Sequence, residues 1–252
     1  SEKIFYIGID RPTKLNGFTP EMFQQMAQAF TEYENNSDAL CALIFSHGPH
    51  FTAGIDLPKI APYMQSGNRE YLHPKGLIDP LGLRGLIRTK PVVCAVRGIT
   101  FTYGVELSLA CDVTIAADNC RFSQLEVLRG IMPTGGATIR FVQRAGWGNA
   151  MKYLLSGMEF NSEEALKMNI VQEIVKSDKV FSRAKEIAKS IASAAPLAVK
   201  ETIKSAKIAL EKGREAAVSE FDSVQEMLAS SNDAKEGVEA FKNKKTPNFK
   251  GN

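Results

Sequence analysis

The sequence has 252 residues, of which 44% are hydrophobic and 23% are charged, and its formal net charge at pH 7 is +3. A chain of this length and apolar content can bury a large core in one or two domains. The charge is too small to indicate nucleic-acid binding by itself, although it suits a small anionic ligand. No apolar run reaches membrane-spanning length, and no signal-peptide pattern opens the chain, so we expect no membrane partner.

The four cysteines stand singly in the sequence, without C-x-x-C spacing, and the chain has only three histidines. This pattern predicts neither a metal site nor a disulfide framework. It favours a reducing compartment, and we therefore expect a cytoplasmic protein.

Strands alternate with helices along the first half of the chain, which predicts an α/β fold. We expect a strand over residues 4–9, a helix from Pro20 to about residue 33 with Thr19 before it, and a buried strand over 42–45. Residues 58–89 contain several prolines and glycines, so short helical pieces in a mobile loop are expected there.

Residues 98–112 combine features of a reactive site. They follow a β-branched strand at 91–96, pass through a glycine-bounded turn, and enter a predicted helix that begins near Tyr103. The first N–H groups of a helix lack intrahelical partners and carry the positive end of its dipole. Glu106 lies one turn into this helix. The stretch therefore offers an oxyanion donor beside a candidate acid or base.

The second half begins with a strand at 113–117 and a second glycine-rich turn at 130–136, which starts a helix at about Ala137. The remainder is predicted to be helical, with Ser162 as an N-cap and a small all-α portion from about residue 195. The predicted helices of this part cover residues 150–155, 162–167, 181–194, 199–210 and 216–229.

Gly54 and Gly104 each lie in a turn after a strand, where a backbone can approach a ligand closely. Glu106 and Glu126 are two candidate carboxylates separated by twenty residues. These features by themselves leave acyl transfer, hydration and simple anion binding open.

Three ordered motifs, at residues 51–57, 98–112 and 124–136, together resemble the crotonase (enoyl-CoA hydratase/isomerase) superfamily. The resemblance implies a ββα-spiral core with an acyl-CoA site in residues 1–194. It also implies a helical region in residues 195–252 that forms homotrimers or dimers of trimers and closes over CoA. Coenzyme A would be part of the substrate, and no further cofactor is implied.

By position, the resemblance assigns the two oxyanion-hole amides to Ile55 and Tyr103 and the catalytic carboxylates to Glu106 and Glu126. Retention of both carboxylates favours a hydratase. A Δ3-Δ2-enoyl-CoA isomerase, which can use one carboxylate at Glu126, and a non-catalytic acyl-CoA-binding homologue are the alternatives. Tyr103 departs from the glycine that is usual in the family, so its ring is a candidate to fill the acyl pocket.

The resemblance also implies which residues contact CoA, including a C-terminal pair supplied by the neighbouring subunit. The implied CoA-binding residues are Lys14, Leu15, Gly17, Ala53, Asp56, Leu57 and, from the neighbour, Phe249 and Lys250. Some relatives bind RNA, and lysines recur at 200, 204, 207 and 212, but this spacing is more typical of a solvated helix face.

Overall fold

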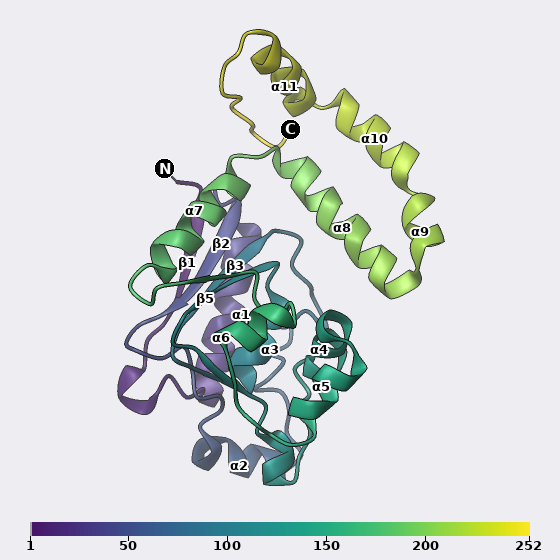
Figure 1. The fold of residues 1–252 in the computed structure, drawn as a ribbon. Coiled ribbons are helices and arrows are strands. Elements are labelled where there is room, and N and C mark those ends of the chain that lie inside the picture. The colour runs from purple at the N-terminus through teal and green to yellow at the C-terminus, as the bar shows by residue number, and fades with distance from the viewer. Residues whose placement is uncertain (1) are drawn as a thin grey trace.

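The computed structural model describes residues 2–252, in which a five-stranded parallel sheet has the order β1-β2-β3-β5-β8 and a smaller sheet has the order β4-β6-β7 (Figure 1). The strands are β1 (Ile4–Ile9), β2 (Cys41–Ser46), β3 (Val92–Val96), β4 (Ile99–Phe101), β5 (Val113–Ala117), β6 (Arg121–Ser123), β7 (Phe160–Asn161) and β8 (Glu173–Val175). The helices of the body are α1 (Pro20–Asn35), α2 (Leu57–Gln65), α3 (Tyr103–Ala110), α4 (Ala137–Ala145), α5 (Trp147–Leu154), α6 (Ser162–Lys167) and α7 (Val180–Ala192). The 3-10 turns are η1 (Pro12–Lys14) and η2 (Glu126–Arg129).

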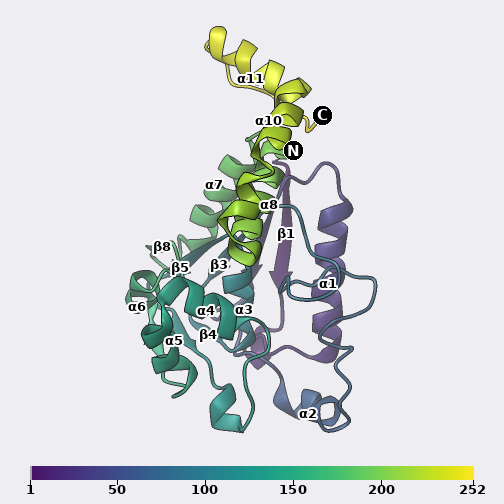
Figure 2. The same ribbon diagram turned by 90° about the vertical axis from the view of Figure 1, so that its right-hand side faces the viewer.

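The central strands of the large sheet are mostly apolar, as expected where both faces of a sheet are covered. Every residue of β3 is buried, and β2 is nearly as buried. Helix α7 packs across β2, β3 and β5, whereas α1 lies on the other side of β1 (Figure 2). Such burial is typical of parallel sheets, in which connecting helices cover both faces. The α/β prediction is therefore confirmed.

Most predicted elements of the body are present, and Thr19 caps α1 by accepting a hydrogen bond from the Met22 N–H at 3.3 Å. One predicted cap was wrong. Asn161, rather than Ser162, caps α6, with its Oδ1 accepting from the Glu164 N–H at 2.9 Å. The Ser162 hydroxyl is used elsewhere, because it donates to the Ala117 carbonyl oxygen at 2.6 Å.

Four helices after residue 195 extend away from the body and form what we call the C-terminal arm, residues 196–252 (Figures 1 and 2). They are α8 (Pro196–Lys212), α9 (Arg214–Val218), α10 (Phe221–Ser230) and α11 (Asn232–Lys242). The single helix predicted over 216–229 was wrong, since the chain turns between α9 and α10 at Glu220, which pairs with Lys204 of α8 at 2.9 Å. No glycine or proline marks this break in the sequence.

The C-terminal arm buries little of its own apolar surface. Neither α8 nor α10 has a buried residue. Large apolar side chains of the arm are exposed instead, and they are Leu210, Val218, Phe221, Met227, Val238 and Phe241. The division of the chain at residue 195 stays a prediction. Among residues 2–252, no helix is both long enough and apolar enough to cross a membrane.

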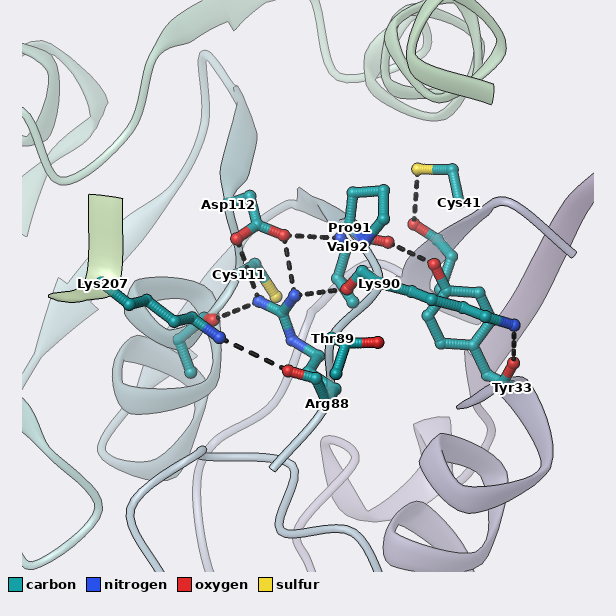
Figure 3. A network of polar contacts seen from close by, with 12 residues as sticks. Tyr33, Cys41, Arg88, Thr89, Lys90, Pro91, Val92, Cys111, Asp112 and Lys207 are labelled. Carbon is teal, nitrogen blue, oxygen red and sulfur yellow. Dashed lines mark hydrogen bonds and ion pairs between the residues drawn. The ribbon is translucent and has the colours of Figure 1, made fainter. Parts of the chain in front are cut away.

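An ion pair within the body, Arg88–Asp112, lies next to a contact between the body and the arm (Figure 3). The Arg88 side chain is 5% exposed, and its guanidinium donates to both Asp112 carboxylate oxygens, at 2.8 Å and 3.2 Å. It also donates to the carbonyl oxygens of Lys90 and Ala110. Lys207 of α8 donates to the Arg88 carbonyl oxygen at 3.4 Å, so the same segment contacts the arm.

The change Asp112→Ala should leave the Arg88 guanidinium buried without its counter-ion. We expect a loss of about 3 kcal/mol in the free energy of unfolding, measured by urea denaturation. Glu159→Ala is the matched control, because it removes the partner of Arg121 from an exposed pair and should cost much less. Equal losses in the two variants would contradict a specific role for the buried pair.

Candidate functional site

A cavity of about 960 Å³ opens in the body between α2, the start of α3 and the turn η2. Its lining is largely apolar, with a small number of polar and charged groups. The lining residues include Ala53, Ile55, Leu57, Met64, Arg69, Tyr71, Leu72, His73, Tyr103, Glu106, Glu126, Arg129 and Gly135.

Two backbone turns pack directly against each other at one wall of this cavity. Thr52 and Thr100 form a parallel bridge, and the Phe101 N–H donates to the Thr52 carbonyl oxygen at 3.0 Å. Gly54 has φ +99°, and a Cβ there would overlap the Thr102 hydroxyl, so this close approach requires glycine. The positive φ angle and the lack of space for a Cβ explain why a glycine is needed at position 54 of this turn.

Ile55 and Tyr103, which lie at these two turns, both line the cavity. Neither amide has a hydrogen-bond acceptor among residues 2–252. Tyr103 is the first residue of α3, where an unpaired N–H is expected from helix geometry. Two N–H donors at the wall of a cavity can bind an oxygen atom that carries negative charge.

The Glu106 carboxylate is 5% exposed and is fixed by backbone amides. Its Oε1 accepts hydrogen bonds from the N–H groups of Gly135, at 2.7 Å, and Ala137, at 3.3 Å. Gly135 has no room for a side chain, because a Cβ would overlap this carboxylate. Burial, together with the nearby charge of Glu126, raises the pKa of Glu106 to about 7.

Glu126 begins the turn η2 and lines the same cavity. Burial raises its pKa to about 7 as well. The Gln124 side chain lies against the Glu126 carboxylate, and with its amide nitrogen on that side it donates to both oxygens, at 3.1 Å and 3.0 Å. The structure thus brings together the two carboxylates that the sequence singled out.

The Tyr103 side chain forms part of the cavity wall. Its ring centroid lies 4.5 Å from that of Phe18 and 4.8 Å from that of Phe23. The side chain is 5% exposed, and burial raises the pKa of its hydroxyl. The ring therefore takes space that a glycine at this position would leave open, and the expected effect of Tyr103 on the shape of the pocket has a structural basis.

Only some of the residues predicted to contact CoA line the cavity. Ala53 and Leu57 line the cavity. Lys14, Leu15, Gly17 and Asp56 are not among the lining residues, although the Ala53 N–H donates to the Leu15 carbonyl oxygen at 2.9 Å.

Phe249 and Lys250 are close in sequence to the C-terminus, which lies near the start of α8 and far from α2 (Figure 1). The Phe249 carbonyl oxygen accepts from Lys3, and the Lys250 N–H donates to Asp233. Within one chain they are therefore not brought to the cavity.

Several polar groups of the site were missed in the sequence. Arg11 pairs with Asp56 at 2.8 Å and donates to the Gly17 carbonyl oxygen at 2.7 Å. Arg69, Tyr71 and His73 line the cavity from the irregular segment after α2. No local pattern marks these residues, because their placement depends on how a long loop folds back onto α1 and α3. Among residues 2–252, no cluster of three or more histidine, cysteine, aspartate or glutamate side chains is arranged to hold a metal ion.

Comparison with known proteins places this geometry in one family. The model of the enoyl-CoA hydratase/isomerase family matches residues 1–252. The chain is 28% identical over 250 residues to the 2,3-dehydroadipyl-CoA hydratase of Escherichia coli K12, covering 99% of this chain and 96% of that one. It is 32% identical over 200 residues to a short-chain-enoyl-CoA hydratase of Clostridium acetobutylicum, covering 79% and 75% of the two chains.

Comparison with solved structures gives the same family. The structure of a probable enoyl-CoA hydratase/isomerase from Mycobacterium abscessus superposes with a TM-score of 0.94 at 41% identity, covering 99% of this chain and 96% of that one. An enoyl-CoA hydratase from Mycobacterium tuberculosis superposes with a TM-score of 0.88 at 27% identity, covering 100% and 97% of the two chains. The crotonase fold and the assignment as an enzyme are confirmed, and the chain belongs to the enoyl-CoA hydratase/isomerase family.

Proposed function

We propose that this protein adds water across the C2=C3 bond of a 2-enoyl-CoA thioester. The observation that carries this proposal is a pair of carboxylates, the buried Glu106 and the half-buried Glu126, which line one cavity and both have pKa values raised to about 7. Near neutral pH such a pair can hold one proton between its members, so that one acts as an acid while the other acts as a base.

The proposed step uses both carboxylates and both amides. The ionised carboxylate takes a proton from water as the water oxygen bonds to C3, and the electrons of the double bond move toward the thioester oxygen. The Ile55 and Tyr103 N–H groups stabilise the resulting enolate oxygen, whose charge is larger in the transition state than in the substrate. The protonated carboxyl group then delivers its proton to C2. The atoms balance without any cofactor besides the CoA of the substrate.

The names of the relatives support this reaction class. Both curated relatives reported above are named as hydratases of CoA thioesters, and further relatives are named carnitinyl-CoA dehydratase. The rival function is isomerisation of a 3-enoyl-CoA, which requires one carboxylate to move a proton from C2 to C4. Binding of acyl-CoA without turnover is the third possibility, and the assays below separate the three.

We further propose that the C-terminal arm mediates assembly into homotrimers or dimers of trimers. Large apolar side chains are exposed on its helices, among them Leu210 and Phe221, and exposed apolar patches are typical of protein–protein interfaces. In such an assembly, Phe249 and Lys250 of one subunit would close over the CoA bound by its neighbour. Their distance from the cavity of their own chain is consistent with that role.

The changes Glu106→Gln and Glu126→Gln should each lower kcat for hydration of crotonyl-CoA by about 100-fold or more, because each removes one proton-transfer group. The measurement follows the thioester chromophore. Glu159→Gln, on the exposed surface, is the control and should keep full activity. Full hydration activity in either cavity variant would contradict the proposal.

Glu106→Ala separates hydratase from isomerase. A hydratase should lose hydration of 2-enoyl-CoA in this variant, whereas isomerisation of a 3-enoyl-CoA that uses Glu126 should persist. If the unmodified protein binds crotonyl-CoA and longer enoyl-CoAs but converts none of them, the non-catalytic alternative is correct.

The hydration rate should depend on pH in a bell shape. At low pH both carboxyl groups are protonated and no base is present, and at high pH both are ionised and no acid is present, so kcat/KM should fall on both sides of about pH 7. Raised carboxyl pKa values also make the folded state lose stability as pH rises from about 4.5 to 7. The thermal midpoint should fall over that range, and fall less in Glu106→Gln. A flat rate profile from pH 5 to 9 would be inconsistent with the proposed acid-base pair.

Lys250→Ala should raise KM for crotonyl-CoA several-fold while leaving kcat nearly unchanged, because a contact to the CoA moiety contributes to substrate and transition state equally. Lys245→Ala, an exposed lysine of the same tail, is the matched control. A large loss of kcat with unchanged KM would exclude a binding role for Lys250.

A further inference from the structure

Two exposed arginines, Arg69 and Arg129, are among the residues that line the cavity. Among residues 2–252, neither guanidinium has a carboxylate oxygen within 4.0 Å. Nearby acids are already engaged: Glu70 lies 3.8 Å from Lys75, and the Asp79 carboxylate accepts hydrogen bonds from three backbone N–H groups. An anionic group on the ligand would complete this charge balance.

A row of aromatic rings locates Arg69 relative to the reacting carbons. The Tyr103 ring, beside the proposed oxyanion amide, contacts Phe23 at 4.8 Å between centroids, and Phe23 contacts Tyr71 at 5.7 Å. The Tyr71 hydroxyl has its pKa raised by burial, and the adjacent Arg69 guanidinium opposes that rise. Arg69 precedes Tyr71 by two residues and therefore lies near the Tyr71 end of this row of rings, whereas Tyr103 is at the other end.

The lining between these points is suited to an acyl chain. Besides the rings of Tyr103, Phe23 and Tyr71, this part of the wall includes the apolar side chains of Met64 and Leu72. Apolar and aromatic side chains match methylene groups, whereas the diphosphate and ribose of CoA require polar contacts. An arginine at the end of such a lining can bind a carboxylate with two parallel hydrogen bonds.

We propose that Arg69 binds a carboxylate at the distal end of the acyl chain, so that the preferred substrates are CoA monothioesters of unsaturated dicarboxylic acids. This inference rests on the proposed hydratase function and specifies the substrate class of the same site. Arg69 acts on specificity and takes no part in proton transfer.

The test compares two ligands of equal length that differ in one charge. The unmodified protein should show a higher kcat/KM for the CoA monothioester of trans-2-hexenedioic acid than for trans-2-hexenoyl-CoA. Arg69→Gln should lower kcat/KM for the first about tenfold or more and change the second less than about twofold. Lys75→Gln is the matched control, since it removes one positive charge from the same loop at a side chain that is 90% exposed and outside the cavity lining.

Binding of the saturated analogues, hexanedioyl-CoA and hexanoyl-CoA, measured by calorimetry, reports recognition independently of turnover. If the unmodified protein prefers the hexanedioyl ester and Arg69→Gln loses that preference, the inference holds even where no hydration is detected, and only the proposed reaction fails. Equal weakening of both esters in Arg69→Gln would overturn the inference. If that equal weakening disappears with 3′-dephospho-CoA esters, Arg69 binds the nucleotide phosphate instead.

Discussion

The close packing of two turns, residues 52–55 and 100–104, is the constraint on which the site depends. Gly54 permits it, because any side chain there would overlap Thr102. The packing places Ile55 and Tyr103 at one cavity, their amides have no acceptor among residues 2–252, and Glu106 follows Tyr103 by about one helical turn. Amides held in this way need no reorganisation when charge develops on a ligand oxygen, and such preorganised donors usually supply the largest single contribution to catalysis.

Burial of the two carboxylates shifts their pKa values in the direction that the proposed chemistry needs. In water, glutamate is ionised at neutral pH and is a poor acid. Here burial raises the pKa of both Glu106 and Glu126 to about 7, and the amides of Gly135 and Ala137 hold the first of them in place. The same burial lowers the stability of the folded state at high pH, so the shift in pKa that suits the proposed chemistry has a cost in folding free energy.

The body and the C-terminal arm differ in how far they bury their apolar side chains. The parallel sheet and the helices that cover it form the body that holds the cavity, whereas the C-terminal arm extends from that body with many apolar side chains exposed (Figure 1). Lys207 of the arm contacts the Arg88 carbonyl oxygen, and the Arg88 side chain pairs with Asp112 within the body, in the segment that leads from the loop after α2 into β3. The irregular loop that contains Arg69 and Tyr71 therefore contacts α8, the first helix of the arm, near the C-terminal end of the loop.

The sequence by itself determined the α/β class, the helix that begins at Tyr103, and both candidate carboxylates, because these follow from apolar periodicity, glycine turns and motifs that are local in the chain. Only the tertiary structure decided which side chains meet in the cavity. Arg69 and Gly135 are far apart in sequence, and no local pattern predicts that a loop and a turn will fold to one wall. The Ser162 cap was wrong for the same reason, since its hydroxyl binds a distant carbonyl oxygen at Ala117. Long-range contacts of this kind depend on how the whole core packs, which short sequence patterns do not encode.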